Sequence, residues 1–256
     1  ATYSVGQVWM FFQALIASDT TNAGLALAAI LSTLIVFVVA VYVQAMKIEI
    51  PLSFGRVRGH GMRWPLNFIY TSNIPVILVS ALFANLQLWV RLLQQWGIKS
   101  WLVGDNGIVT YVQAPNIVGE IIKQGGFLIG GNMYLRATIY TVAMIIGCII
   151  FSYFWVQTAG MDARSQAKQI MSSGLQIPGF RKDQRVLERL LNRYIGPLTF
   201  MGAITIGILA AMADLSGALS QGTGILLTVM IVYKLYEEIA KEHMMDMHPM
   251  LRKMME

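Results

Sequence analysis

The stretch Leu25–Val43 reads LALAAILSTLIVFVVAVYV, and only Ser32 and Thr33 interrupt its apolar side chains. A run of about 18 or more apolar residues is long enough for a helix that crosses a bilayer. The whole chain of 256 residues is 56% hydrophobic and only 12% charged, whereas soluble domains contain about 25% charged residues. The sequence therefore predicts an all-α integral membrane protein.

Four further apolar blocks follow this first one along the chain. We expect five transmembrane helices, at 24–43, 69–91, 136–157, 196–213 and 217–233. Between and around them lie an external segment at 1–23, a basic loop at 44–68, an external loop at 92–135, a basic loop with an amphipathic helix at 158–195, and a tail at 234–256. The last two helices are short and rich in glycine, and small residues let helices approach closely, so we expect both inside a bundle.

The distribution of positive charge sets the predicted orientation. The segments 44–68, 158–195 and 234–256 fall on one side of the membrane and hold 15 of the 19 lysines and arginines. Cytosolic loops of membrane proteins carry the excess of positive charge, so we expect these segments and the C-terminus in the cytosol. An odd number of spans with an external start also indicates that further helices precede this chain. Residues 1–23 match no pattern that assigns them a place.

Two basic loops have recognisable local patterns. The segment 47–65 alternates apolar and charged residues and then places glycines around Arg56 and Arg58, which is typical of a β-hairpin with a basic tip. In 158–195 a short helix is expected at 162–172, followed by a Pro-Gly turn that presents Arg181 and Lys182. The charges can reflect nothing more than a cytosolic location. They can also form a docking surface for a phosphate-rich macromolecule, or meet anionic lipid headgroups.

The residue types that membrane enzymes require are missing from the predicted spans. All three histidines lie in cytosolic segments, and Asp214 is the only aspartate near a helix, at the short outer turn between the last two spans. The single Cys148 lies in an apolar block, where helix packing is the expected role. Neither a metal site nor a phosphate loop fits these spacings. The sequence predicts no enzyme, metal or cofactor.

Polar residues inside the spans are few and uncharged. Ion-driven transporters place ionisable groups near the middle of the membrane, and the span interiors contain none. Asn85 and Gln87 are the strongest polar groups in the second span, and they fit either interhelical hydrogen bonds or a seam that opens. The absence of buried charge argues against an ion-driven pump and leaves a passive conduit open.

The second span begins with an unusual sequence, YTSNIPVILVS at Tyr70–Ser80. Its four polar residues, Tyr70 to Asn73, lie where the cytosolic loop reaches the bilayer, so we expect them to contact water or to cap the helix. Pro75 falls in the first turn, where its missing N–H group costs little.

Several stretches together resemble one known family. They are KIEIPLSFGRVRG at 47–59, FIYTSNIPVIL at 68–78 with ALFAN after it, FRK at 180–182, NRYIGPLT at 192–199, and GTGILL at 222–227 before IVYKLYEE. In this order and spacing they resemble the SecY-type alpha subunit of the protein-translocation channel, in its archaeal form. The resemblance runs from about residue 25 to the C-terminus.

The resemblance implies a ten-helix channel built from two pseudo-symmetric halves, of which this chain would be the C-terminal half. Such a channel passes unfolded secretory polypeptides across the cell membrane of an archaeon and releases hydrophobic segments sideways into lipid. The implied partners are the N-terminal half, small SecE-type and beta-type subunits, the ribosome near its exit tunnel, the nascent polypeptide with its signal sequence, and membrane lipids.

The resemblance also implies roles for individual residues. Two positions of the apolar pore ring fall on Ile77 and Leu227, and the asparagine of the lateral gate falls on Asn85. The ribosome-docking residues fall on Arg56, Arg58, Arg181 and Lys182. Branched aliphatic side chains in such a ring can yield to a passing chain and resist ion leak by dewetting.

Two other classes of protein remain as alternatives. One is half of a secondary transporter built from repeats with broken helices near the middle of the membrane. The other is a membrane scaffold whose basic loops anchor a cytosolic complex. A transporter would bind a small solute saturably, whereas a conduit would cross-link to a nascent chain.

Overall fold

The computed structural model describes residues 6–54, 61–96, 111–124, 126, 131–172, 175–176 and 183–247. The helices are α1 Gln7–Ile16, α2 Thr20–Ala45, α3 Ile74–Gln95, α5 Ile117–Gln124, α6 Gly131–Thr158, α7 Ala163–Ser172, α8 Gln184–Leu215 and α9 Gly222–Met247. The strands are β1 Lys47–Phe54, β2 Gly61–Asn67 and β3 Leu175–Gln176. The short helix predicted at 162–172 is confirmed by α7.

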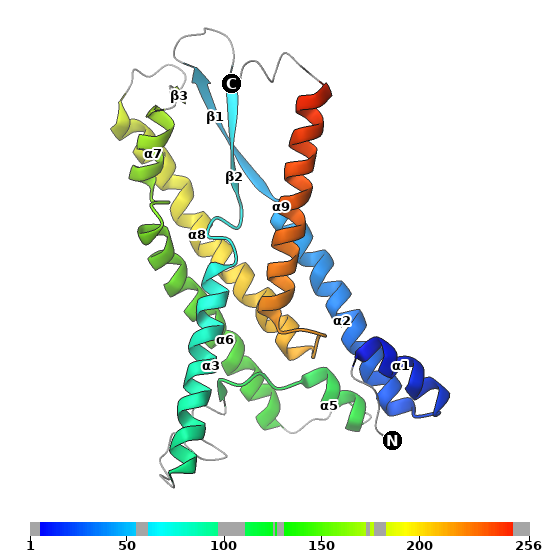
Figure 1. Ribbon diagram of the computed structural model, residues 1–256. Helices are drawn as coiled ribbons and strands as arrows, with labels where there is room; N and C mark the ends of the chain where they lie inside the picture. Colours follow the sequence, from blue (N-terminus) through cyan, green and yellow to red (C-terminus); the bar gives the residue numbers. More distant parts are fainter. Residues whose placement is uncertain are drawn as a thin grey trace.

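The long helices run between two ends of the molecule. The hairpin of β1 and β2, α7 and the C-terminal end of α9 gather at one end, while α1 and α5 lie at the other (Figure 1). The described parts of the segments predicted to be cytosolic are therefore together at one end, and the described parts of those predicted to be external are together at the other.

Four of the described helical stretches are long and apolar enough to cross a membrane: α2, α3, residues 131–172, which include α6, and α8. The helix expected at 217–233 exists as α9, but it starts later and continues to Met247. Its apolar part ends at Lys234. The apolar part of α9, residues 222–233, is about 18 Å long, which is shorter than a hydrocarbon core of about 30 Å.

The N-terminal segment, which the sequence pattern left unassigned, forms α1 and the first turn of α2. The carboxylate of Asp19 accepts a hydrogen bond from the Asn22 N–H group at 3.3 Å, so α2 begins at Thr20. The expected start at residue 24 is late because hydropathy detects the apolar block and not the polar cap in front of it.

The predicted hairpin is confirmed, and a third strand joins it. β1 and β2 are antiparallel, with Lys47 opposite Asn67 and Ser53 opposite Gly61. β3 pairs with the other edge of β1, so the sheet order is β2-β1-β3. A strand of two residues carries no periodic signal, which is why the sequence did not predict β3.

The core of the bundle is α8, the most buried of the membrane-crossing candidates. The sequence predicted a cytosolic amphipathic helix up to residue 195 and a separate span from 196 onward. Instead α8 continues through Pro197. The proline removes only one backbone N–H group. Leu187, Leu191 and Ile195 before it, and Leu198 after it, are buried in the same apolar cluster.

Glycines mark the closest helix contacts. A Cβ atom at Gly207 of α8 would approach the Ile145 Cα atom of α6 to 3.1 Å, and one at Gly147 of α6 would approach Val79 of α3 to 2.8 Å. The expectation that the glycine-rich helices lie inside the bundle holds for α8. It holds for only part of α9, where Ile231, Leu235 and Tyr236 are exposed.

Candidate functional site

The polar segment before α3 is a junction between helices. The Tyr70 hydroxyl donates to the Met161 carbonyl at 2.6 Å, and the Ser152 hydroxyl of α6 donates to Thr71 Oγ1 at 2.9 Å. The Ser152 hydroxyl also lies 3.4 Å from the Thr199 carbonyl of α8. We call Tyr70–Asn73 with these partners the α3 junction.

The last two residues of the segment reach α9. The Ser72 hydroxyl donates to the Met230 sulfur, and Ser72 has a positive φ of 57°. The Asn73 Nδ2 group donates to the Leu226 carbonyl at 2.5 Å. Four successive polar residues thus contact α6, α9 and the segment before α7.

The structure corrects the expectation that these residues cap α3 or contact water. Asn73 occupies the N-cap position, but its side chain makes no capping hydrogen bond. The buried polar side chains of the described chain are Thr71, Asn73, Ser152 and Thr199, and all four belong to the α3 junction. A buried polar group is costly unless it is paired, so this clustering fixes which helices meet here.

The two predicted ring residues lie beside the α3 junction. Ile77 is one turn beyond Asn73 on α3, and its N–H group donates to the Asn73 carbonyl at 3.3 Å. Leu227 directly follows Leu226, whose carbonyl accepts from Asn73. Both ring residues are half-buried. The Asn73–Leu226 hydrogen bond therefore ties α3 to α9 within one helical turn of each predicted ring residue.

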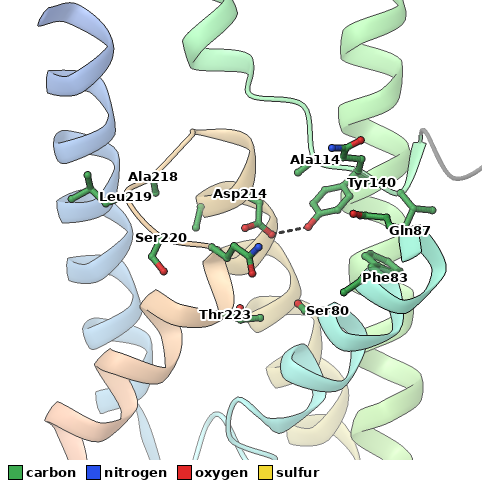
Figure 2. A pocket seen from close by; sticks show the side chains of 15 residues that line it. Ser80, Phe83, Gln87, Ala114, Tyr140, Asp214, Ala218, Leu219, Ser220 and Thr223 are labelled. Carbon is green, nitrogen blue, oxygen red and sulfur yellow. Dashed lines mark hydrogen bonds between the residues drawn. The ribbon is translucent and has the colours of Figure 1, made fainter. Parts of the chain in front are cut away.

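A cavity of about 480 Å³ begins one turn further along the same two helices. Ser80 lies three residues after Ile77, and Thr223 lies four residues before Leu227, so each shares a helix face with a ring residue. Figure 2 shows the lining from α3, α6, the end of α8 and the start of α9. Its polar members are Ser80, Gln87, Gln113, Tyr140, Asp214, Ser220, Gln221 and Thr223.

Asp214 is the one carboxylate of this lining, and the sequence placed it in the short turn outside α8. The structure places it inside the last turn of α8. Its Oδ2 atom accepts from the Tyr140 hydroxyl at 2.6 Å, as Figure 2 shows. Its Oδ1 atom accepts from the Gly222 N–H group at 2.7 Å. No sequence signal paired Asp214 with a tyrosine 74 residues earlier.

Asn85, the predicted gate residue, lies apart from the cavity. It is exposed on α3, eight residues or about 12 Å beyond Ile77 along the helix axis. Leu82, Leu86 and Trp89 around it are also exposed. Asn85 therefore lies on an open apolar face, and Gln87 alone of the predicted polar pair lines the cavity.

The predicted docking residues Arg56, Arg58, Arg181 and Lys182 lie outside the described residues. The strands that precede them are described: Ser53 pairs with Gln176, and Phe54 with Leu175. The chain segments that lead into the two basic loops are therefore hydrogen-bonded to each other. Within the described part of the chain, no group of three or more His, Cys, Asp or Glu side chains could hold a metal ion.

Comparisons with known proteins agree on one family. The SecY family matches residues 2–236, including the N-terminal segment that the sequence pattern left unassigned. The "Protein translocase subunit SecY" of Methanococcus vannielii is 44% identical over 255 residues, which cover 97% of this chain and 56% of the relative. That of Methanocaldococcus jannaschii is 41% identical over 257 residues, which cover 98% and 56%.

Solved structures give the same result. One described as "the structure of a protein conducting channel" superposes with a TM-score of 0.75 at 41% identity, and covers 96% of this chain and 56% of that one. A second concerns the plug domain of the SecY protein and has the same TM-score and coverage. The chain spans about half the length of the curated relatives it matches.

Proposed function

The chain belongs to the SecY family, and from this premise we propose that it forms the C-terminal half of the central subunit of a protein-conducting channel. The half would be pseudo-symmetric with an N-terminal half of five further helices. Its role is that of a conduit and not of an enzyme: unfolded secretory polypeptides pass through it, and hydrophobic segments leave sideways into the membrane.

The observation that carries this proposal is the hydrogen bond from Asn73 to the Leu226 carbonyl. It places two branched aliphatic residues, Ile77 and Leu227, at the boundary between a buried polar junction and a cavity lined by polar groups. An apolar constriction next to a wet vestibule is the arrangement that blocks ions by dewetting and still yields to a polypeptide.

The proposed fifth span is α9. Its apolar part is too short to cross a bilayer alone, and its first half packs against the core through Ile225, Leu226 and Val229. A helix that lines a conduit is bordered by protein and water for part of its length, so it needs less lipid-facing apolar surface. α2, α3, α6 and α8 would be the other four spans.

The proposed orientation puts the hairpin, α7 and the C-terminal end of α9 in the cytosol of an archaeal cell. The excess of lysine and arginine in those segments supports it. Exposed positive side chains of α7 and of the first three turns of α8 lie at the same proposed cytosolic end; they are Arg164, Lys168, Arg185, Arg189 and Arg193.

The proposed partners are the N-terminal half, SecE-type and beta-type subunits, the nascent chain with its signal sequence, lipids and the ribosome. For the ribosome, Arg56, Arg58, Arg181 and Lys182 would make the phosphate contacts. The pairing of β1 with β3 supports this, because it gives both basic loops one common base. Charge reversal at Arg56 and Arg181 should weaken ribosome binding and reduce its salt dependence, whereas Arg91→Glu at the opposite end should not.

Site-specific photo-cross-linking in the complete channel tests the conduit itself. A photoreactive residue at Ile77 or Leu227 should form an adduct with a stalled translocating chain. The same probe at Ile35, which is exposed on α2, is the control. Adducts at Ile35 with none at Ile77 or Leu227 would reject the pore assignment. Saturable binding of a small solute in place of a polypeptide would support a transporter.

A further inference from the structure

The position of α9 depends on one carboxylate at its beginning. The turn between α8 and α9 is short, and Gly217 within it has a φ of +64°. Asp214 Oδ1 accepts the Gly222 N–H group at 2.7 Å, and that group is among the first N–H groups of α9, which have no partner inside the helix. Asp214 thus acts as a cap supplied by the preceding helix, where a negative charge is favourable.

The same carboxylate is fixed from a third helix. Its other oxygen accepts the Tyr140 hydroxyl of α6 at 2.6 Å. Tyr140 is buried and belongs to the main apolar cluster, and so does Ala213 beside Asp214. Hydrogen bonds to a charged group are stronger than neutral ones. The start of α9 is therefore attached through Asp214 to α6 and α8, the two most buried of the apolar helical stretches.

Packing restricts the same point of α9. A Cβ atom at Gly222 would collide with the backbone of Ala210 on α8. The helix start can therefore not shift toward α8, and the Asp214 hydrogen bond prevents it from moving away. The close contact with Ala210 and the hydrogen bond to Asp214 together also fix the position of Gly222 along the axis of α9.

Leu227 lies five residues after Gly222, which is about 7.5 Å along the axis. The residue directly before it, Leu226, is held through its carbonyl by Asn73 at the start of α3. Leu227 therefore directly follows a segment of α9 that is held at both ends, by Asp214 at Gly222 and by Asn73 at Leu226. Loss of either bond would remove a restraint on α9 within about 7.5 Å of the proposed constriction.

We propose that Asp214 is a positioning residue for the constriction: it fixes the start of α9 to Tyr140 and α8 and thereby holds Leu227 against Ile77 in the resting channel. The inference rests on the proposed function, because it assigns Asp214 a role through Leu227. It adds a residue outside the ring that determines how well the ring seals.

The test measures ion leak through the complete channel reconstituted in phosphatidylcholine vesicles without substrate. Asp214→Ala removes both hydrogen bonds. Loss of a charged hydrogen bond should shift the population from closed to leaky by roughly tenfold. Asp214→Asn keeps an acceptor for the Gly222 N–H group and should restore the seal. Tyr140→Phe removes one of the two bonds and should give a smaller leak, which provides a second variant if Asp214→Ala folds poorly.

The matched control is Gln87→Ala. Gln87 lines the same cavity from α3, so its loss changes the polarity of the cavity and leaves both hydrogen bonds of Asp214 in place. It should leave the leak unchanged. Equal leak in Gln87→Ala and Asp214→Ala would show that cavity polarity matters, and would overturn the positioning role.

Two further outcomes separate the proposals. In the first, a photoreactive residue at Leu227 cross-links a stalled chain, but the Asp214→Ala channel seals as well as the wild type and is only less stable. Asp214 is then a helix cap alone, and the inference is wrong. If wild-type Ile77 and Leu227 give no adduct while Ile35 does, the proposed function itself fails. A leak in Asp214→Ala together with reduced disulfide formation between Ile77→Cys and Leu227→Cys supports the positioning role.

Discussion

The two ends of α3 differ in how they are held. At its start every polar residue of Tyr70–Asn73 bonds to another part of the chain, and the buried residues of the helix, Pro75, Val76 and Val79, all precede Ser80. Beyond Ser80 the helix presents exposed side chains such as Leu88 and Trp89. Ile77 therefore lies near the held end of α3, whereas Asn85 lies on its exposed part.

This difference fits the two roles proposed for α3. A ring residue must stay in place if the seal is to re-form, whereas a gate wall must move if a hydrophobic segment is to leave. The structure places Ile77 one turn from the buried junction and Asn85 about 12 Å further along the axis. Substitutions at each end of α3 can therefore separate the two roles.

The largest effect should come from pushing the fixed end of α3 away from α6. Gly147→Val places atoms where Val79 already lies, since even a Cβ atom at Gly147 would be only 2.8 Å from it. Overpacking should lower the free energy of unfolding by about 3 kcal/mol, measured by denaturant titration of the channel in micelles. Gly131→Val on the same helix has open space around it and should cost little. Equal losses for the two variants would contradict this packing.

The next effect should come from the amide that ties α3 to α9. Asn73→Leu keeps the size of the side chain and removes the hydrogen bond to the Leu226 carbonyl. It should lower the free energy of unfolding by about 2 kcal/mol and raise the resting ion leak. The matched variant on the exposed end of α3, Asn85→Leu, should change the free energy of unfolding by less than about 0.5 kcal/mol. Comparable destabilisation by both would show that the ends of α3 do not differ.

A smaller effect is expected at the Ser152 hydroxyl, which links Thr71 to the Thr199 carbonyl. Ser152→Ala leaves the Thr71 oxygen without its donor and should cost about 1 kcal/mol. Thr141→Val on the same helix removes a hydroxyl that bonds within its own helix, to the Ala137 carbonyl. Thr141→Val should lower the free energy of unfolding by less than Ser152→Ala does, as measured by thermal or denaturant titration. A larger loss for Thr141→Val would argue against the α3 junction.

The smallest effect is expected where α9 is held far from α3. Lys47 Nζ lies 2.9 Å from Glu237 Oε1, and this hydrogen bond raises the pKa of Lys47 above its ordinary value of 10.5. The stabilisation should therefore be complete below about pH 10.5 and disappear as the pH rises through the raised pKa. A double-mutant cycle with Lys47→Met and Glu237→Gln should give a coupling of about 0.5 kcal/mol at pH 7. A coupling that grows above pH 11 would contradict this ion pair.

The local patterns predicted most of the elements because their signals lie within a few residues. The apolar block at 25–43 is enough for a spanning helix, and the alternation at 47–65 is enough for a hairpin. The boundary at Pro197 was misplaced because the same periodic apolar face continues on both sides of it. Burial of that face against α6 and α7 outweighs the local tendency of proline to end a helix.

The site divides in the same way. Ile77, Leu227 and Asn85 came from the resemblance to a family, since nothing in a lone isoleucine or leucine distinguishes a ring from ordinary packing. The polar segment Tyr70–Asn73 was visible in the sequence, but its partners were not. Local reasoning assigns such residues to a cap, because a cap needs only neighbours in the chain.

From the sequence alone it follows that the chain has membrane-crossing helices and where most of the long ones lie, because hydropathy and periodicity depend on residues close in the chain. The pairing of Asn73 with Leu226, and of Asp214 with Tyr140 and Gly222, is visible only in the folded chain. Those partners are 153, 74 and 8 residues apart, and a hydrogen bond across such distances exists only after the helices have packed. A polar group that is buried without a partner is costly, and packing determines which partner is within reach.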